Sequence, residues 1–288
     1  MKETTIKRKD KTTYLREFKS LDEFYNYITN TPLNDVFRWE ELSSSARGPH
    51  KERWTGTSSY EEAVGLFKNG WQDMAKTLTK SIKVKQNQVE NAQVQKVMYD
   101  IVGFQASVPR YLQGIPTSMI NKKLVPVKQR VITLNKDISY NASVKTEDII
   151  EASVQTIHLI KKIEAQGIRV NLNLIWGSGA GETREVMKIK LKSANERINI
   201  SKLAFPLVNP SMLRRLCFRY FEVAPTITSD YRFGYGAPLD GSQLKIYCKD
   251  EYVLPRLFDG NLSSLGDLSK ICNITDEIVN GSSDKPKI

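Results

Sequence analysis

The stretch VITLNKDISYNASV, residues 131–144, decides the fold. Its apolar start, residues 131–134, predicts a short buried strand, and Asp137 stands just past the carboxyl end of that strand. Polar side chains then follow at every second position: Ser139, Asn141 and Ser143. A carboxylate followed by hydroxyl and amide oxygens at this spacing suggests a metal site in which some ligands have been replaced.

The residues after this stretch predict a helix and a second strand. Thr146 begins the helix, with Glu147 and Asp148 in the first turn, where acidic groups interact favourably with the helix dipole. Apolar residues recur at helical spacing up to Gly167, which is suited to end the helix. The next residues, IRVNLNLIW (168–176), alternate apolar and polar side chains, the period of a strand with one buried face. We expect the helix to lie against the sheet.

A hairpin is predicted next. GSGAGETR, residues 177–184, supplies turn residues, and EVMKIKLKS (185–193) resumes the alternation. In this second strand Lys188, Lys190 and Lys192 are expected to face solvent. A lysine row suits an edge strand, because positive charge discourages pairing between sheets. The hairpin should therefore form an antiparallel edge.

The C-terminal part predicts further helices and one more strand. A helical apolar stripe passes through residues 212–220, and QLKIYCKD (243–250) has the pattern of a strand. LPRLFDGNLSSLGDLSKICNI (254–274) predicts a final helix, and residues 281–288 a disordered tail. We assign residues 126–280 to one α/β domain.

The N-terminal half, residues 1–125, is expected to be mainly helical and packed on the core. Residues 1 to about 15 are polar and predict a frayed tail. Capping boxes at Ser20/Glu23 and Ser59/Glu62 begin two helices, and the second either ends at Gly70 or continues through residues 71–82. Residues 99–119 mix apolar groups with glycine and proline, which predicts a loop-rich segment packed against the domain that follows.

The order of elements predicts an α/β fold with a mostly parallel sheet, in which ligands sit outside the carboxyl ends of the strands. The strand ending at Asp137, the helix to Gly167 and the hairpin resemble the start of a von Willebrand factor A-like (Rossmann-like) domain. The blocks at 54–71, 102–119, 131–144 and 163–176 resemble, in this order, an uncharacterised family of bacteriophage and mobile-element proteins carrying such a domain. The resemblance covers roughly residues 54–200.

The resemblance implies a divalent cation at the end of the first strand. Asp137 and Ser139 match the first two positions of the family's Asp-x-Ser-x-Ser motif, and Asn141 replaces the second serine. A threonine and an aspartate from later loops complete the family's site. Candidates here, none in a matching motif, are Thr183, Thr226, Thr228, Asp230, Asp240 and Asp250. We expect a degenerate site, with no cofactor or with Mg²⁺ held by Asp137, Ser139 and Asn141; an aspartate that only caps the following loop is the alternative.

Composition bounds the class of protein. The chain has 288 residues, of which 40% are hydrophobic and 26% charged, as in an ordinary soluble globular protein. Three widely spaced cysteines suggest a reducing compartment, and the sequence has neither a membrane span nor a signal peptide. We expect a cytoplasmic protein, in the host cell if it is phage-encoded. The net charge of +11 attracts anionic partners without identifying them.

The candidate catalytic groups do not predict an enzyme. Of the two histidines, His50 lies in a polar segment and His158 in an amphipathic helix, and Cys217 lies on an apolar stripe. GSGAG (177–181) is not followed by the Lys-Ser/Thr pair of a phosphate-binding loop. We therefore expect a protein without catalytic residues.

Two functions remain open. The first is a protein-interaction role in which Asp137, Ser139, Gly177, Gly179 and Gly181 contact a partner; by family resemblance this would be a phage protein, a host factor or an AAA+ ATPase. The second is nucleic-acid binding. The basic residues expected to contact the backbone are Lys188, Lys190, Lys192, Arg214, Arg215 and Arg219.

Overall fold

The computed structural model describes residues 1–8, 10–37, 42, 44–46, 49–81, 93–126, 130–140, 144–165, 167–231, 234–254 and 256–257. The predicted helix at 254–274 and the predicted tail at 281–288 therefore lie almost wholly outside the described residues. Among the helices that are described, none is both long and apolar enough to cross a membrane.

The main sheet joins strands from both halves of the chain. In the described ranges these are β1 (Lys2–Arg8), β2 (Lys11–Phe18), β6 (Val131–Asp137), β7 (Arg169–Ala180), β8 (Thr183–Lys192), β9 (Ala237–Pro238) and β10 (Tyr252–Leu254). The order is β1-β2-β8-β7-β6-β10, with β9 beside β7. Pairing is parallel at β2–β8, β6–β7 and β6–β10 and antiparallel elsewhere, so β1, β6, β7 and β10 share one direction. The fold is α/β with a mixed, mostly parallel sheet.

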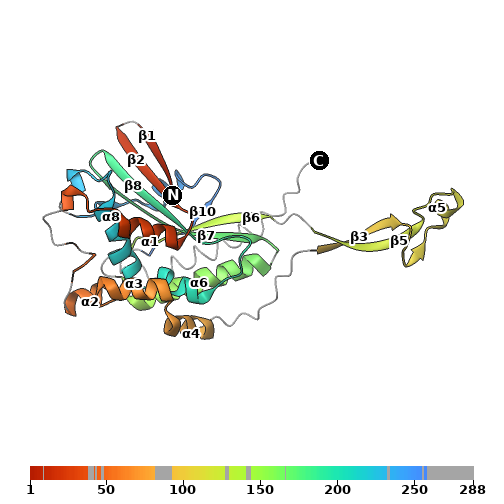
Figure 1. Ribbon diagram of the computed structural model, residues 1–288, viewed down its shortest axis with the longest axis horizontal. Helices are drawn as coiled ribbons and strands as arrows, with labels where there is room; N and C mark the ends of the chain where they lie inside the picture. The colour runs from red at the N-terminus through yellow and green to blue at the C-terminus, as the bar shows by residue number, and fades with distance from the viewer. Residues whose placement is uncertain are drawn as a thin grey trace.

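The sequence predicted a frayed tail for residues 1 to about 15, but the structure shows two strands there. They form the antiparallel hairpin β1–β2, and β2 lies beside β8, so that β8 is an interior strand and not an edge (Figure 1). Arg16 of β2 is fully buried, because its guanidinium pairs with the buried carboxylate of Glu185 on β8. The expected boundary at residues 125/126 is therefore crossed by a single sheet.

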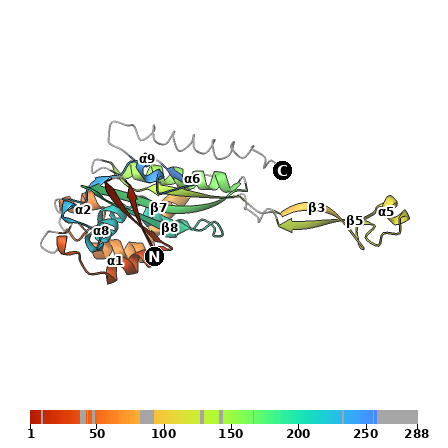
Figure 2. The same cartoon turned by 90° about the horizontal axis from the view of Figure 1, so that it is seen from above.

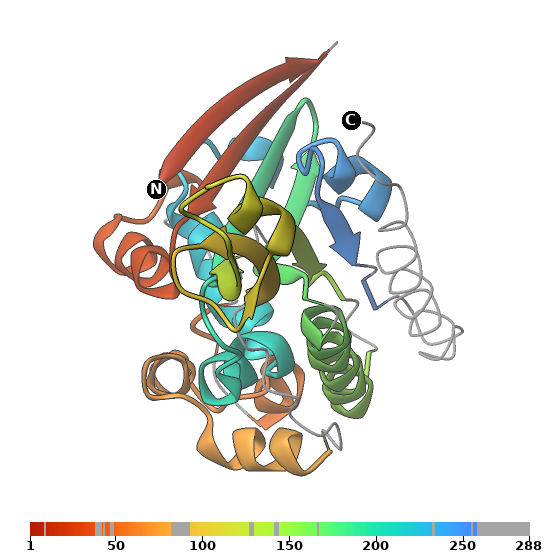
Figure 3. The ribbon, with the colours of Figure 1, turned by 90° about the vertical axis from the view of Figure 1, so that its right-hand side faces the viewer.

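One face of the sheet is covered by helices from both halves of the chain, whose apolar residues share one core with β6, β7 and β8 (Figure 3). They are α1 (Leu21–Asn30), η1 (Asp35–Phe37), α3 (Tyr60–Asn69), α4 (Gln72–Ser81), α6 (Thr146–Ala165), α7 (Ile200–Val208), η2 (Met212–Cys217) and α8 (Phe218–Val223). The short helix α2 (Pro49–Thr55) lies beside them, where the Trp54 ring contacts the Phe218 ring of α8. The predicted starts are confirmed, since Ser20 and Ser59 accept hydrogen bonds from the amides of Glu23 and Glu62. Gly70, with φ of 78°, ends α3.

The other face carries a smaller apolar cluster beneath α9 (Gly241–Lys245). This helix replaces the strand predicted at 243–250. Asp240 caps the helix and forms a capping box with Gln243, whose side chain returns to the Asp240 amide. A strand does follow, but it is β10, at Tyr252–Leu254.

A separate three-stranded sheet forms an arm. It contains β3 (Gln93–Asp100), β4 (Gln105–Ala106) and β5 (Met119–Pro126), with the short helix α5 (Val108–Leu112) at its tip. The arm extends away from the body in both side views (Figures 1 and 2). Residues 99–119 were predicted to pack against the following domain. Instead they are mostly exposed. Most of the glycine and proline residues that suggested loops lie in the connections between the strands and the helix of this arm.

Candidate functional site

Asp137 ends β6 at the point where the strand order reverses. Both neighbours, β7 and β10, are parallel to β6, and Asp137 lies in register with Ile175 of β7. In open α/β sheets ligands bind outside the carboxyl ends of the strands at such a switch point. The fold thus places Asp137 where the sequence predicted it.

The Asp137 carboxylate is buried and only half satisfied. Asp137 is 1% exposed and Ser139 is 2% exposed. Oδ1 of Asp137 accepts a hydrogen bond of 2.8 Å from the Ser139 amide, whereas Oδ2 and the Ser139 Oγ have no hydrogen-bond partner among the described residues. Burial raises the pKa of Asp137 to about 6, although Ser139, Lys136 and Arg256 lower it. A cation or a water beside the two oxygens would remove this penalty.

These two oxygens fit part of a Mg²⁺ site. Asn141, the third predicted ligand, lies outside the described residues. Four of the later candidates are engaged elsewhere: Thr226 donates to Glu185, Thr183 and Thr228 share a hydrogen bond, and Asp240 caps α9. Within the described ranges, no group of three or more His, Cys, Asp or Glu side chains could hold a metal. The described residues therefore supply two oxygen ligands of a cation that prefers six.

The same burial bears on the predicted contact of Asp137 and Ser139 with a partner. Their side chains present almost no surface, so a protein cannot reach them in this conformation. The burial of the Asp137 and Ser139 side chains is more consistent with a site for a small ligand than with a docking surface for a protein.

The predicted flexible loop at 177–181 is mostly strand. Gly177 and Gly179 lie within β7, and only Gly181 lies in the turn to β8, with a φ of 53° that favours glycine. The small residues are needed because Leu239 and Leu244 pack directly on Gly177. Gly179 and Gly181 line a cavity of about 160 Å³ beside Lys11 and Arg184.

Alanine at position 177 should destabilise the protein. Its Cβ would lie 2.8 Å from methyl carbons of both Leu239 and Leu244, and overpacking of this kind costs about 1–3 kcal/mol. Gly179→Ala is the matched control, because its nearest neighbour would be 3.4 Å away. Urea unfolding of both variants measures the difference. Equal stabilities would contradict the close packing on Gly177.

The lysine row is not a solvent-exposed edge. Lys188 is 7% and Lys192 2% exposed, and of the three only Lys190 is exposed. Lys188 pairs with Glu251, and the Lys192 ammonium donates to Glu164 at 2.6 Å and to the Val170 carbonyl. The prediction was wrong because β2 covers the presumed edge and each buried lysine has an acidic partner.

Two of the three predicted nucleic-acid arginines are also internal. Arg214 is 4% exposed and donates to the Trp54 carbonyl, with its guanidinium also over the Trp54 ring. Arg215 is fully buried. Its donors reach the carbonyls of Ser44, Ala46 and Thr57 and the hydroxyls of Thr55 and Thr57. Arg219 alone is half-exposed. Four of the six predicted residues thus cannot contact a nucleic-acid backbone.

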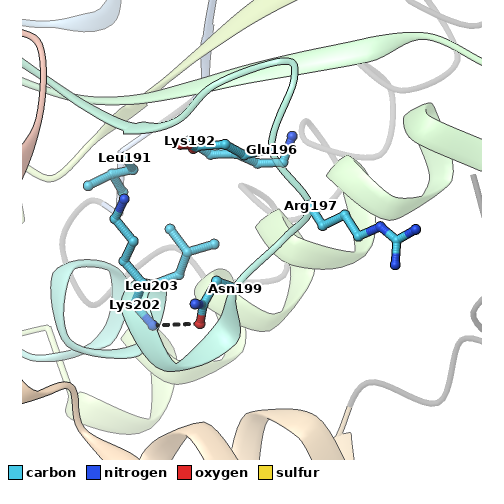
Figure 4. Close-up of a pocket in the computed structure, with 7 residues that line it drawn as sticks. All are labelled: Leu191, Lys192, Glu196, Arg197, Asn199, Lys202 and Leu203. Carbon is cyan, nitrogen blue, oxygen red and sulfur yellow. Dashed lines mark hydrogen bonds between the residues drawn. The ribbon is translucent and has the colours of Figure 1, made fainter. Parts of the chain in front are cut away.

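A cavity of about 200 Å³ lies where β8 leads into α7 (Figure 4). Lys192 contributes to its lining, together with Arg197 and Lys202. The amide of Lys202 donates to the Asn199 side chain, which caps α7, and Arg197 points away from the other side chains in this view. This cavity does not gather the predicted basic residues into one surface.

The most exposed apolar surface was missed by the sequence reasoning. It lies on the arm, and we call it the arm tip: Tyr99, Ile101, Val102, Phe104, Val108, Tyr111 and Leu112, which are 49–78% exposed. Exposed apolar groups gathered on one projection mark an interaction site more often than isolated ones do. The sequence signal that could have indicated this surface is the apolar content of residues 99–119, a segment that also contains glycine and proline.

Comparison with known proteins identifies a family only. The family model described as "Domain of unknown function (DUF7192)" matches residues 2–273. No curated protein and no solved structure matches the chain.

Proposed function

The chain belongs to the DUF7192 family, and from that premise we propose that it is a non-enzymatic interaction protein whose arm tip inserts into a protein partner. The observation that carries the proposal is the concentration of exposed large apolar side chains on the arm tip. Phe104 is 61%, Tyr111 71% and Leu112 78% exposed. Aromatic side chains are enriched at protein interfaces, and a few anchors of this kind carry most of the binding energy.

Internal contacts hold the arm tip in shape. The Arg110 guanidinium lies 4.3 Å from the centre of the Tyr99 ring and donates to the Thr117 carbonyl at 3.0 Å. The Lys122 ammonium lies 5.3 Å from the centre of the Phe104 ring. A preformed surface loses less conformational entropy on binding, which favours affinity.

The charge of the arm indicates the kind of partner. Residues 93–126 contain four basic residues, Lys96, Arg110, Lys122 and Lys123, and one acidic residue, Asp100. Complementary charge favours encounter and register. We therefore propose a partner with an apolar pocket and an acidic rim.

The resemblance to von Willebrand factor A-like phage and mobile-element proteins extends the proposal. The reversal of strand order at β6, with Asp137 at its end, supports such a domain with a degenerate Mg²⁺ site. The partner would be another protein of the same element, a host factor or an AAA+ ATPase. The basic residues predicted for nucleic-acid binding lend little support to that alternative, since most of them are buried.

Photocrosslinking tests the proposal. A crosslinking amino acid at Phe104 should capture a protein that the same group at Lys76, an exposed position on α4, does not capture. The captured protein, once purified, should bind the wild-type chain and lose at least about tenfold affinity for the combined variant Val102→Ser, Phe104→Ser and Leu112→Ser. Calorimetry measures the affinity, and circular dichroism checks that the variant folds.

Two results would contradict the proposal. One is equal affinity of the purified partner for the wild type and the triple variant. The other is a triple variant that loses binding to phosphatidylglycerol vesicles while no protein crosslinks at Phe104, since this would assign the arm tip to a membrane surface.

A further inference from the structure

A cavity of about 250 Å³ lies in the helical layer, away from the arm and from Asp137. It is bounded by α1, the turn at Ser44–Ser45, the start of α3 and α8, which lie toward the end of the body far from the arm (Figure 1). Five of its six lining residues carry a polar group: the lining is Ile28, Thr29, Ser44, Ser45, Tyr60 and Arg219. Hydroxyl groups and a guanidinium thus surround a space large enough for a small molecule.

Tyr60 contributes a buried hydroxyl without a partner. Its Oη has no hydrogen bond with any described residue. Burial raises the pKa of Tyr60 to about 12, so the hydroxyl keeps its proton at neutral pH. A buried donor without an acceptor is costly, and an acceptor in the cavity would satisfy it.

Arg219 contributes unused donors to the same cavity. Among the described residues it forms one ion pair, with Glu222, at a nitrogen–oxygen distance of 3.6 Å, longer than a hydrogen bond. The Glu222 carboxylate already accepts hydrogen bonds from the Ser44 amide, the Ser44 hydroxyl and the Tyr235 hydroxyl. The planar guanidinium therefore has donors available for a second, better aligned acceptor.

We propose that this cavity binds a small carboxylate, with Arg219 and Tyr60 donating to its two oxygens. A guanidinium recognises carboxylates and phosphates through paired hydrogen bonds. Glu222 lies beside Arg219 and offsets its charge, so a monoanion meets less repulsion than a phosphate dianion. Ile28 provides an apolar wall for a short hydrocarbon chain. This site is independent of the arm tip and of the proposed interaction function.

Calorimetric titration of the full chain with butyrate tests the inference. Butyrate should bind, and its neutral isostere butyramide should bind at least about tenfold more weakly, because it offers no charged acceptor. Tyr60→Phe should weaken butyrate about tenfold, and Arg219→Gln should abolish binding. Tyr27→Phe is the matched control, since Tyr27 also has a buried hydroxyl without a partner but does not line the cavity.

Stability measurements distinguish a loss of butyrate binding from misfolding of the variant. Without butyrate, Tyr60→Phe should melt no lower than the wild type, because no hydrogen bond is lost. The inference is overturned if the wild type binds neither butyrate nor inorganic phosphate, or if Tyr60→Phe and Tyr27→Phe change affinity equally. Stronger binding of inorganic phosphate than of butyrate would overturn the assignment to a carboxylate.

Discussion

Arg215→Ala should lower the free energy of unfolding by about 3–5 kcal/mol. Arg215 has no exposed surface, and hydrogen bonds from its guanidinium join residues 44–46 and 55–57 to η2. Removing the guanidinium leaves several buried carbonyl and hydroxyl groups without a donor and creates a cavity. Guanidinium chloride unfolding, followed by tryptophan fluorescence, measures the loss.

Arg219→Ala is the matched control for this prediction. Arg219 lies one helical turn away, and its side chain is 24% exposed with a single loose ion pair. The nitrogen–oxygen distance of this pair is 3.6 Å, longer than a hydrogen bond, so Arg219→Ala should lower the free energy of unfolding less than Arg215→Ala does. Comparable losses for the two variants would show that the Arg215 network does not hold the segments together.

Asp137→Asn should stabilise the protein at neutral pH by about 2–3 kcal/mol. Burial raises the pKa of Asp137 from 3.8 to about 6, so ionisation opposes folding. The favourable contribution is complete below the pKa of the unfolded chain and is lost as pH rises through about 6. As the pH rises from about 4 to about 7, the free energy of unfolding of the wild type should therefore fall relative to that of Asp137→Asn. Chemical unfolding at several pH values measures this difference.

Ser139→Ala separates the carboxylate from its neighbour, because it keeps Asp137 and should keep the pH dependence. Magnesium provides a second readout. If the two oxygens hold a cation, Mg²⁺ should raise the wild-type melting temperature and leave Asp137→Asn unchanged. The same pH dependence in Asp137→Asn as in the wild type would contradict the assignment of this titration to Asp137.

The central part of the fold was predictable because its periodicities are regular. The strand ending at Asp137, the helix Thr146–Ala165 and the strand from Arg169 are confirmed, each with apolar residues on the expected face. Helix starts at Ser20 and Ser59 were also predictable, since a capping side chain acts within three residues. These signals are local.

The errors come from pairings between residues far apart in the sequence. Lys192 was predicted to face solvent, but it is buried against a distant acid, Glu164. Arg16 directly follows the segment predicted to be a frayed tail, and it is buried against Glu185. The interior position of β8 depends on its pairing with β2 of the N-terminal hairpin, which no local sequence pattern predicts. The arm was missed for a related reason, since its strands show no clear alternation of apolar and polar residues.

The pairing of β2 with β8 constrains the order in which the chain can fold during synthesis. Arg16 meets its partner Glu185 only after 169 further positions have been translated. At about 5–20 residues per second, the ribosome needs on the order of ten seconds to deliver that partner. The edge of β2 must stay unpaired for this time, and an unpaired strand edge can pair with the edge of a neighbouring nascent chain.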